Sequence, residues 1–417
     1  METIKIPFKV TARMTCRICQ SPKLQFLYSL GNLFISNFVK SGQSGIKAPL
    51  EMLLCRNCTL VQLRHTAPQE LLYSRYYWYR SGVTDTMKKA LRDITEEIER
   101  FVDFQKGDIV LDIGSNDGTL LRSYQIPGLV KIGFEPAINL KEEGEKGVNI
   151  FVNDFWDSKL YLNKVRKKAK VITAIGMFYD MEDPNEFIKD AAGILDEKGI
   201  FIAQLMCLKN MIDTNDLGNI CHEHLEYYSL AALKYLFNNN NLEIIDISHN
   251  NVNGGSYRIF VRPVGGIVEP FEGAHKRLRY YFNQEKKLGT KSVHLDFFKR
   301  VETNKKKTVD FIKEQKAKGK RIWAYGASTK GNTILQYFGL DNRLIEGVSD
   351  KSPDKWQKET IGTHIPIYSE EAARKANPDY FLVLPYAFIN EFRKRERVWL
   401  SKGGRFILPL PEFKIVQ

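Results

Sequence analysis

The sequence lacks any long apolar run. No stretch of its 417 residues approaches the ~18 uninterrupted apolar residues that a membrane-spanning helix needs. Its first ten residues, METIKIPFKV, lack the apolar segment and small-residue cleavage site of a secretion signal. We therefore expect a cytoplasmic protein without a membrane partner.

Acidic residues are fewer than basic ones. The chain has 49 Asp and Glu against 62 Lys and Arg, a formal net charge of +13, which favours anionic ligands in general. The basic runs at 164–170, 299–307 and 393–397 are scattered rather than gathered. Scattered runs are typical of solvated helix faces, so we expect no nucleic-acid partner.

The length and composition predict more than one folded unit. A chain of 417 residues is longer than a typical domain with a single hydrophobic core and indicates two or three domains. Hydrophobic residues make up 43% of it, enough to bury sizeable cores. No internal repeat of 20–50 residues is evident, and the sequence does not indicate an oligomeric state.

Cysteine is scarce, but four of the six cysteines are paired in sequence. They form two C-x-x-C knuckles, Cys16/Cys19 and Cys55/Cys58. In a reducing compartment such knuckles indicate a tetrahedral zinc site rather than disulfides. Four thiolates leave no open position for water, so the predicted zinc is structural. Two unrelated cysteine pairs are the alternative.

Residues 109–121, IVLDIGSNDGTLL, contain the most informative motif. An apolar strand at 109–113 leads into a turn at Gly114, and Gly118 opens a helix. This geometry lets the backbone approach a polar ligand closely, although the G-x-G-x-x-G fingerprint is incomplete. A second strand at 130–134 ends at Glu135, whose carboxylate can hold two ribose hydroxyls. We predict S-adenosylmethionine as the ligand, with Asp112 orienting the turn or the amino-acid end of that ligand; an ordinary strand–turn–helix is the alternative.

Alternating strands and helices surround this motif. After a helix at 84–104, we expect strands at 109–113, 130–134, 148–152, 170–175 and 199–206, with helices between most of them. This alternation indicates a parallel sheet covered on both faces. A helix at 228–239 and a hairpin with strands at 242–248 and 256–262 follow.

A second α/β unit is predicted towards the C-terminus. Helices expected at about 269–288 and 296–318 lead into a strand at 320–325, and further strands are expected at 345–348, 380–384 and 405–408. The turn at Gly326 lacks the GKS/GKT of a P-loop. Its backbone amides, with Lys330 and Asn332, could receive a phosphate, or the turn could only pack helix on strand. We predict domains at 1–70, 71–268 and 269–417.

The segment CHEHLEYYS, residues 221–229, concentrates ionisable side chains. His222 and His224 are two residues apart, so the H-E-x-x-H pattern of a catalytic zinc site is not met. An imidazole with a neighbouring carboxylate, such as Glu223, suits proton transfer. A polar helix start is the alternative.

Tyrosines are dense at 71–82, LLYSRYYWYRSG. Tyr73, Tyr76, Tyr77, Trp78 and Tyr79 fall within seven positions. Such a cluster is either a packed seam between domains or a wall that contacts a sugar or base.

The combination of LDIGSNDG with FEPA resembles the class I methyltransferases. The SNDGTLL form behind a four-cysteine module resembles a narrower group, the sugar-nucleotide C-methyltransferases that act on keto-deoxysugars. The resemblance runs from Cys16 into the C-terminal third. It implies an α/β protein with a zinc-binding module, a class I (Rossmann-like) methyltransferase core and a C-terminal Rossmann-like domain that faces a nucleotide-sugar substrate.

The resemblance also implies roles for individual residues. Glu223 and His224 correspond to residues linked with base catalysis, and His222 lies beside them. From the aromatic cluster we choose Tyr79, as part of our leading hypothesis, to support the sugar or enolate. Cofactor contacts are expected from Asp112, Gly114, Asn116, Asp117, Gly118, Glu135, Asp154 and Phe155. Substrate contacts are expected from Lys330, Asn332, Cys221 and Asp180.

The chain departs from the family at three substrate-facing positions. Cys221 replaces a family Tyr, Asp180 a family His, and Asn253 the His of a hairpin motif. These departures leave the sugar and the methylated atom open. Our leading hypothesis is a C-methyltransferase in which His224 removes a proton next to a ketone. An O- or N-methyltransferase and a zinc-containing nucleic-acid-binding or scaffold protein are the alternatives.

Overall fold

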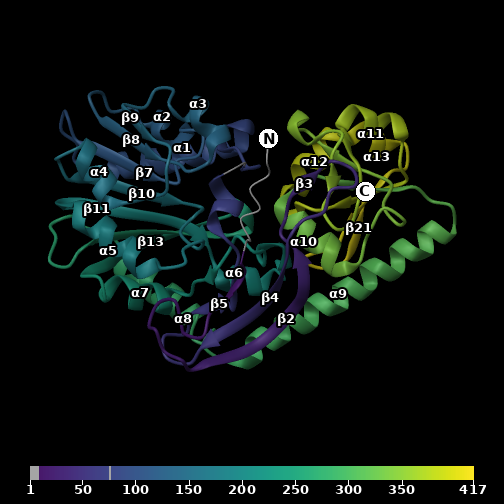
Figure 1. Cartoon of the computed structure of the whole chain (residues 1–417), viewed down its shortest axis with the longest axis horizontal. Coiled ribbons are helices and arrows are strands. Elements are labelled where there is room, and N and C mark those ends of the chain that lie inside the picture. Colours follow the sequence, from purple (N-terminus) through teal and green to yellow (C-terminus); the bar gives the residue numbers. More distant parts are fainter. Residues whose placement is uncertain (1–8, 75–76) are drawn as a thin grey trace.

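The computed structural model describes residues 9–74 and 77–417 (Figure 1). Two α/β units lie side by side, one built around β7–β11 and the other around β15–β20. The N-terminal strands lie below and between them, and helix α9 (Lys291–Ala317) runs beneath the second unit. Within the described ranges, no helix is both long and apolar enough to cross a bilayer.

The first unit is a seven-stranded sheet in the order β13-β14-β11-β10-β7-β8-β9, with only β14 antiparallel to its neighbours. The strand order reverses between β7 and β10, and ligands bind at such a switch point, outside the carboxyl ends of the strands. The strands are β7 (Ile109–Ile113), β8 (Val130–Phe134), β9 (Ile150–Val152), β10 (Ala169–Ile175), β11 (Leu195–Met206), β13 (Leu242–Asn250) and β14 (Ser256–Pro263).

Helices cover both faces of this sheet. Every residue of β7 is buried, as expected for a parallel strand covered on both sides. In α1, Leu91, Ile94 and Ile98 are buried on one helical face, and the Thr84 side chain caps the helix by accepting from Met87 N–H. The helices are α1 (Asp85–Phe101), α2 (Thr119–Ser123), α3 (Lys141–Gly144), α4 (Ser158–Lys164), α5 (Pro184–Ile194), α6 (Leu208–Asp213), α7 (Leu230–Asn238) and α8 (Ala274–Gln284).

The second unit is a six-stranded sheet in the order β18-β16-β15-β19-β20-β21, parallel except for β21. The strand order of this sheet reverses between β15 and β19. The strands are β15 (Ile322–Tyr325), β16 (Val348–Asp350), β18 (Ile367–Ser369), β19 (Tyr380–Val383), β20 (Arg405–Leu408) and β21 (Lys414–Val416). Its other helices are α10 (Thr329–Phe338), α11 (Glu370–Ala376), α12 (Ile389–Arg395) and α13 (Arg397–Ser401).

The N-terminal segment pairs with strands from elsewhere in the chain. An antiparallel sheet combines β2 (Leu24–Phe34), β4 (Lys47–Cys55) and β5 (Val61–Leu63) with β12 (Glu226–Tyr227). Strand β1 (Thr11–Ala12) pairs with β6 (His65–Thr66), and β3 (Phe38–Val39) pairs with β17 (Glu359–Thr360).

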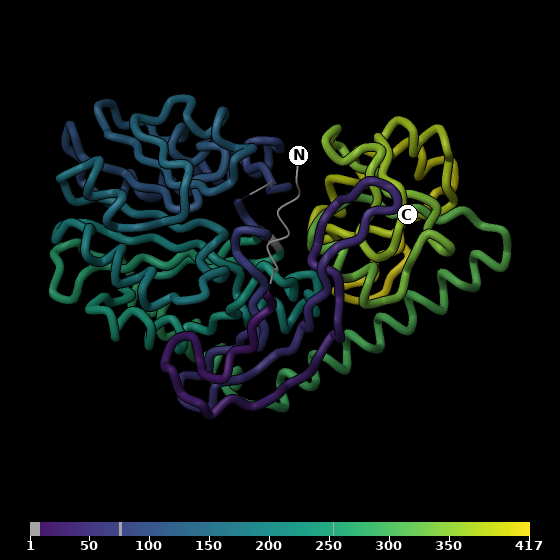
Figure 2. Tube along the Cα trace, in the orientation of Figure 1, coloured from purple at the N-terminus to yellow at the C-terminus, as the bar shows by residue number. Residues whose placement is uncertain are grey.

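The long β2–β4 hairpin reaches from one α/β unit to the other (Figure 2). At its far end, the Gln336 side chain of α10 accepts a hydrogen bond from Phe34 N–H (2.8 Å) and donates one to the Phe34 carbonyl (3.1 Å). The side chain of Asn332 donates to the Asn37 carbonyl at 2.9 Å. The N-terminal strands therefore hold the two units in a fixed relation.

Candidate functional site

A cavity of about 880 Å³ lies where the switch points of the two α/β sheets face each other. From the first unit it is lined by residues that follow β7 and β10, among them Gly114 and Met177. From the second it is lined by 328–330 after β15 and by 384–388 after β19. Both sheets thus present their ligand-binding edges to one space.

The turn after β7 requires glycine. Gly114 has φ +73°, and a Cβ there would lie 2.7 Å from Met177 Cγ. Gly118 also has φ +73° and would meet the Gly144 carbonyl oxygen at 2.9 Å. Gly114 lines the cavity, whereas Gly118 packs against α3. The two glycines therefore shape the turn, and the backbone at Gly114 lies open to a ligand.

Glu135 is held at the cavity wall by its neighbours. One carboxylate oxygen accepts from Asn116 N–H and the other from Ala137 N–H, both at 2.9 Å. Each oxygen keeps a lone pair for a further donor. Burial raises the pKa of Glu135 to about 6, with the two backbone donors acting against it. The residue fits a role as acceptor for two ribose hydroxyls.

Asp112 lines the same wall from the end of β7. Its Oδ1 accepts a hydrogen bond from Thr173 Oγ1 on β10 at 2.6 Å. Burial raises its pKa to about 7, with the Thr173 hydroxyl acting against the rise. A positively charged ligand group would compensate this buried carboxyl.

Asn116 lines the cavity and Asp117 does not, and both side chains bond to the backbone at 79–82. The Asn116 side chain accepts from Ser81 N–H (2.9 Å) and donates to the Tyr79 carbonyl (3.1 Å). The Asp117 carboxylate accepts from Gly82 N–H at 2.6 Å. The glycine turn is thereby tied to the segment that carries Tyr79.

The residues after β9 divide into two groups. Phe155 and Trp156 line the cavity, and the buried Nε1 of Trp156 has no hydrogen-bond partner among the described residues. Asp154 is exposed, lies outside the cavity lining and accepts from Phe155 N–H. The two aromatic side chains can border a ligand in this part of the cavity.

His224 is the member of the 221–224 segment that lines the cavity. Its Nδ1 lies 2.8 Å from the main-chain oxygen of Asn219. A carbonyl oxygen only accepts, so Nδ1 carries the proton and Nε2 keeps its lone pair. The ring packs edge-on against Tyr179, with centroids 4.6 Å apart. Burial first, and then the charge of Lys330, lower the pKa of His224 to about 3, which keeps the imidazole neutral.

The other three residues of this segment turn away from the cavity lining. His222 Nε2 contacts the Ala48 carbonyl of β4 at 2.9 Å. Cys221 is fully buried, with its thiol 3.9 Å from the Asn219 carbonyl. The Glu223 carbonyl accepts from Tyr73 Oη at 2.5 Å, and burial raises the pKa of the Glu223 carboxyl to about 7.

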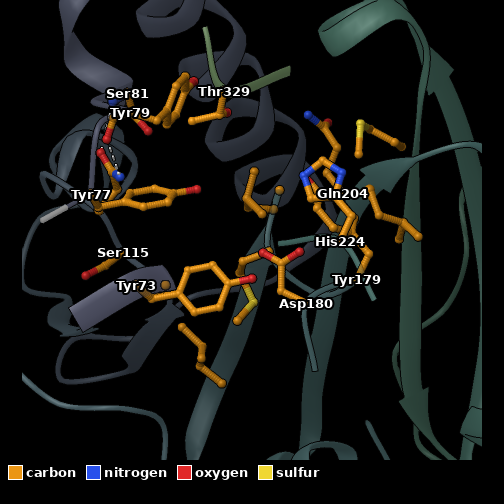
Figure 3. A pocket seen from close by; sticks show the side chains of 18 of the residues that line it. Tyr73, Tyr77, Tyr79, Ser81, Ser115, Tyr179, Asp180, Gln204, His224 and Thr329 are labelled. Atoms are coloured by element: carbon orange, nitrogen blue, oxygen red, sulfur yellow. Dashed lines mark hydrogen bonds between the residues drawn. The ribbon is translucent and has the colours of Figure 1, made fainter. Parts of the chain in front are cut away.

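Tyr73, Tyr77 and Asp180 lie in the same cavity as His224 (Figure 3). The rings of Tyr73 and Tyr77 project towards Asp180, and Tyr79 lies further along the same wall. Asp180 is buried, its Oδ1 has no hydrogen-bond partner among the described residues, and burial raises its pKa well above the ordinary value. This orphan acceptor is available to a ligand donor.

The aromatic cluster combines the two predicted roles, cavity wall and packed seam. Tyr73, Tyr77 and Tyr79 line the cavity. Trp78 packs edge-on against Phe38 of β3, with centroids 5.1 Å apart, and so contributes to the seam between the units. Tyr76 and the side chain of Asn253 lie outside the part of the chain that is described.

A polar network that is not evident from the sequence links His224 to the second α/β unit. Asn219 is its centre: its side-chain oxygen accepts from Lys330 Nζ, and its amide donates to Asp216 at 2.7 Å. Tyr386 donates to the same Asp216 carboxylate. Lys330, Asp216 and Tyr386 line the cavity, whereas Asn332 lies outside the lining and ties α10 to Asn37. Asn219 stands two residues before Cys221, but its partner Lys330 and the Tyr386 that bonds to Asp216 come from distant parts of the chain.

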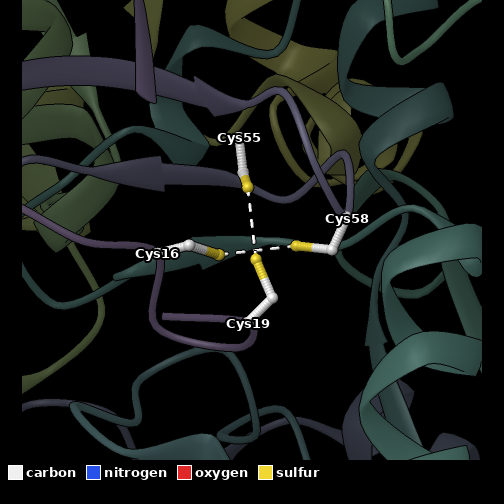
Figure 4. A group of neighbouring side chains, drawn as sticks. All are labelled: Cys16, Cys19, Cys55 and Cys58. Atoms are coloured by element: carbon white, nitrogen blue, oxygen red, sulfur yellow. Dashed lines mark hydrogen bonds between the residues drawn. The ribbon is translucent and has the colours of Figure 1, made fainter. Parts of the chain in front are cut away.

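The four predicted metal ligands converge (Figure 4). Their sulfur atoms lie within 4.8 Å of one another, with Cys16–Cys58 and Cys19–Cys55 each 3.4 Å apart. Tetrahedral zinc bonded to four thiolates at about 2.3 Å places sulfur atoms ~3.8 Å apart. The residues therefore fit a structural zinc ion, and their four donors complete its coordination.

The sheet order, the glycine turn after its first strand and the acidic residue after its second define a class I methyltransferase fold. Three family models match in sequence: "Putative zinc binding domain" at 16–73, "Methyltransferase domain" at 86–247 and "C-methyltransferase C-terminal domain" at 251–411. The three models follow one another along the chain as the zinc-binding, methyltransferase and C-terminal domains of C-methyltransferases, and the chain is an S-adenosylmethionine-dependent methyltransferase.

Individual proteins are similar to all or part of this chain. The C-methyltransferase NovU of Streptomyces niveus is 27% identical over 407 residues, which cover 96% of each chain. Among solved structures, the mitomycin 7-O-methyltransferase MmcR matches 43% of this chain and 54% of its own, at 12% identity and TM-score 0.33. A methyltransferase from Clostridium acetobutylicum matches 43% of this chain and 93% of its own, at 16% identity and TM-score 0.34.

Proposed function

We propose that the protein transfers a methyl group to the carbon next to the ketone of a nucleotide-linked keto-deoxysugar. The observation that carries the proposal is His224, a neutral imidazole at the cavity wall whose Nδ1 proton is fixed by the Asn219 carbonyl. A carbon acid needs such a base, whereas transfer to a hydroxyl or amine does not require loss of a C–H proton.

The cofactor would lie against the first α/β sheet. Glu135 would accept from the ribose hydroxyls, Asp112 would face the amino-acid end, and Phe155 with Trp156 would border the adenine. S-adenosylmethionine, when bound, supplies an electrophilic methyl group. The backbone at Gly114 leaves room for its close approach.

The sugar nucleotide would occupy the space between the two sheets. Its ketosugar would lie between His224 and the wall formed by Tyr73, Tyr77 and Tyr79, with the orphan oxygen of Asp180 accepting from a sugar hydroxyl or amine. Its pyrophosphate would face the first turn of α10, where helix N–H groups favour an anion. Asp180 replaces a family histidine, so this contact is where the acceptor sugar would differ.

Proton removal would use the Nε2 lone pair of His224. Glu223 is excluded from the cavity lining, so its contribution would be to hold the segment through the bond from Tyr73 to its carbonyl. His222 would act likewise through Ala48 of β4.

The test is methyl transfer from S-adenosylmethionine labelled with carbon-13 in its methyl group, on a panel of nucleotide-linked 4-ketosugars. We expect a product whose labelled methyl resonates as a carbon-bound methyl group. A labelled methyl on oxygen or nitrogen would instead assign O- or N-methyl transfer. Absence of transfer to every ketosugar would contradict the proposed substrate class.

A further inference from the structure

Lys330 stands out among the cationic groups of the cavity. It lies in the first turn of α10 in the second α/β unit, yet its Nζ donates to Asn219 Oδ1 and contacts Met206 Sδ at 3.1 Å, both in the first unit. An amide oxygen and a thioether are neutral partners. Among the described residues no carboxylate forms an ion pair with Lys330, whereas the guanidinium of Arg80, which also lines the cavity, lies 3.6 Å from the Asp354 carboxylate.

The position of Lys330 relative to the base is fixed through a single residue. Asn219 accepts from Lys330 through its side chain and holds His224 Nδ1 through its main chain. The Lys330 ammonium and the His224 ring therefore border the same part of the cavity. An ammonium has three donors, so one remains for a ligand beyond the two neutral contacts.

We propose that Lys330 is a catalytic residue that donates a hydrogen bond to the ketone oxygen of the substrate as negative charge develops there. This inference rests on the proposed carbon-acid chemistry. In the step, the C–H bond next to the ketone breaks and its proton goes to His224 Nε2. The electron pair of that bond forms the C=C bond of the enolate, and the carbonyl π pair moves to oxygen, where the Lys330 ammonium stabilises it.

This assignment differs from phosphate binding, the role first expected for Lys330. Lys330 is anchored to Asn219, the residue that orients His224, and not to a group of the α10 turn. Burial is the larger cause of the lowered pKa of His224, and the nearby Lys330 charge adds to it. When the enolate forms between them, its negative charge neutralises that effect, and His224 becomes more basic as it takes the proton.

The experiment is deuterium wash-in from D2O into a nucleotide-linked 4-ketosugar, with S-adenosylhomocysteine bound and mass detection. Wild type is compared with Lys330→Met, Lys330→Ala and a control, Lys351→Met, an exposed lysine after β16 of the same unit. Removing one oxyanion donor costs about 10²–10³-fold in rate. We expect a loss of this size in the limiting exchange rate of both Lys330 variants, with ketosugar affinity changed only a few-fold.

Chemical rescue separates charge from structure. Ethylammonium should restore part of the exchange rate in Lys330→Ala and none in Lys330→Met, whose side chain fills the space. S-adenosylhomocysteine affinity, measured by calorimetry, should match wild type in folded variants. Two results would overturn the role proposed for Lys330 but leave the proposed function intact. They are exchange at the wild-type rate in Lys330→Met, and a loss of ketosugar affinity without a loss of the limiting exchange rate. Either result would instead support phosphate binding by Lys330. Absence of exchange by wild type on every ketosugar would overturn the proposed function as well.

Discussion

The main-chain oxygen of Asn219 lies 2.8 Å from Nδ1 of His224, and the side-chain oxygen of the same residue accepts from Lys330. One residue thus sets the tautomer of the candidate base and places a cation beside it. Because Lys330 belongs to the second α/β unit, the candidate catalytic groups are complete only when the two units are held together. The hairpin that starts from the zinc module holds them so.

Loss of one zinc ligand should destabilise that arrangement. Cys58→Ser leaves three thiolates, and we expect the bound zinc to fall from one ion per chain to a small fraction of that. The midpoint of thermal unfolding should fall with it, because structural zinc contributes folding free energy. Elemental analysis of the purified protein measures the zinc. Cys207→Ser is the matched control, since Cys207 is buried outside the cluster. One zinc ion per chain in Cys58→Ser would contradict the assignment of Cys58 as a zinc ligand.

Glu135→Gln should weaken cofactor binding. The substitution removes the charge that would accept from both ribose hydroxyls and places an amide donor opposite a backbone N–H group. Hydrogen bonds to a charged group contribute about 1.5–3 kcal/mol, so we expect affinity for S-adenosylmethionine to fall by roughly 10- to 100-fold. Calorimetric titration measures this. Glu143→Gln, on the surface of α3 and paired with Lys146, should bind as wild type does; equal loss in both variants would argue against the ribose contact.

His222 should make stability depend on pH. Burial lowers its pKa to about 4, from an ordinary value near 6.5. At a pH between these two pKa values, His222 is protonated in the unfolded chain and neutral in the folded chain. The stability contributed by neutral His222 is therefore complete above about pH 6.5 and is lost as the pH falls towards 4.

His222→Gln removes this titration while keeping an N–H donor for the Ala48 carbonyl. Relative to wild type, the variant should gain about 1.4 kcal/mol in free energy of unfolding between about pH 7.5 and about pH 5.5. Urea unfolding at the two pH values measures it. The exposed His275, replaced in the same way, should show no such gain. A pH-independent difference for His222→Gln would mean that His222 is not held neutral.

Most of the cofactor half of the site could be predicted from the sequence. Parallel strands carry their carboxyl ends to one edge, so a glycine turn after one strand and Glu135 after the next had to meet. The two cysteine knuckles were equally direct, because each supplies two ligands over four residues. Asn116 and Asp117 were predicted to contact the cofactor, but the sequence could not show that their side chains hold backbone at 79–82, since that depends on how the preceding segment folds back.

Less of the substrate half of the site could be predicted from the sequence. Residues 221–225 are irregular between η4 (Leu217–Asn219) and β12, so no helix or strand period indicates which of His222, Glu223 and His224 faces the cavity. The Asn219 network joins residues more than a hundred positions apart, from the two different α/β units. Only the packing of those sheets against the N-terminal hairpin brings them together.

The most direct test of the central claim is solvent deuterium wash-in at the carbon next to the ketone, in the absence of methyl transfer. Wild type should exchange that hydrogen on a nucleotide-linked ketosugar, and His224→Gln should exchange it about 10²–10⁴-fold more slowly. His275→Gln should retain the wild-type rate, and affinity for S-adenosylhomocysteine should be unchanged in both variants. Exchange at the wild-type rate in His224→Gln would contradict the assignment of His224 as the base.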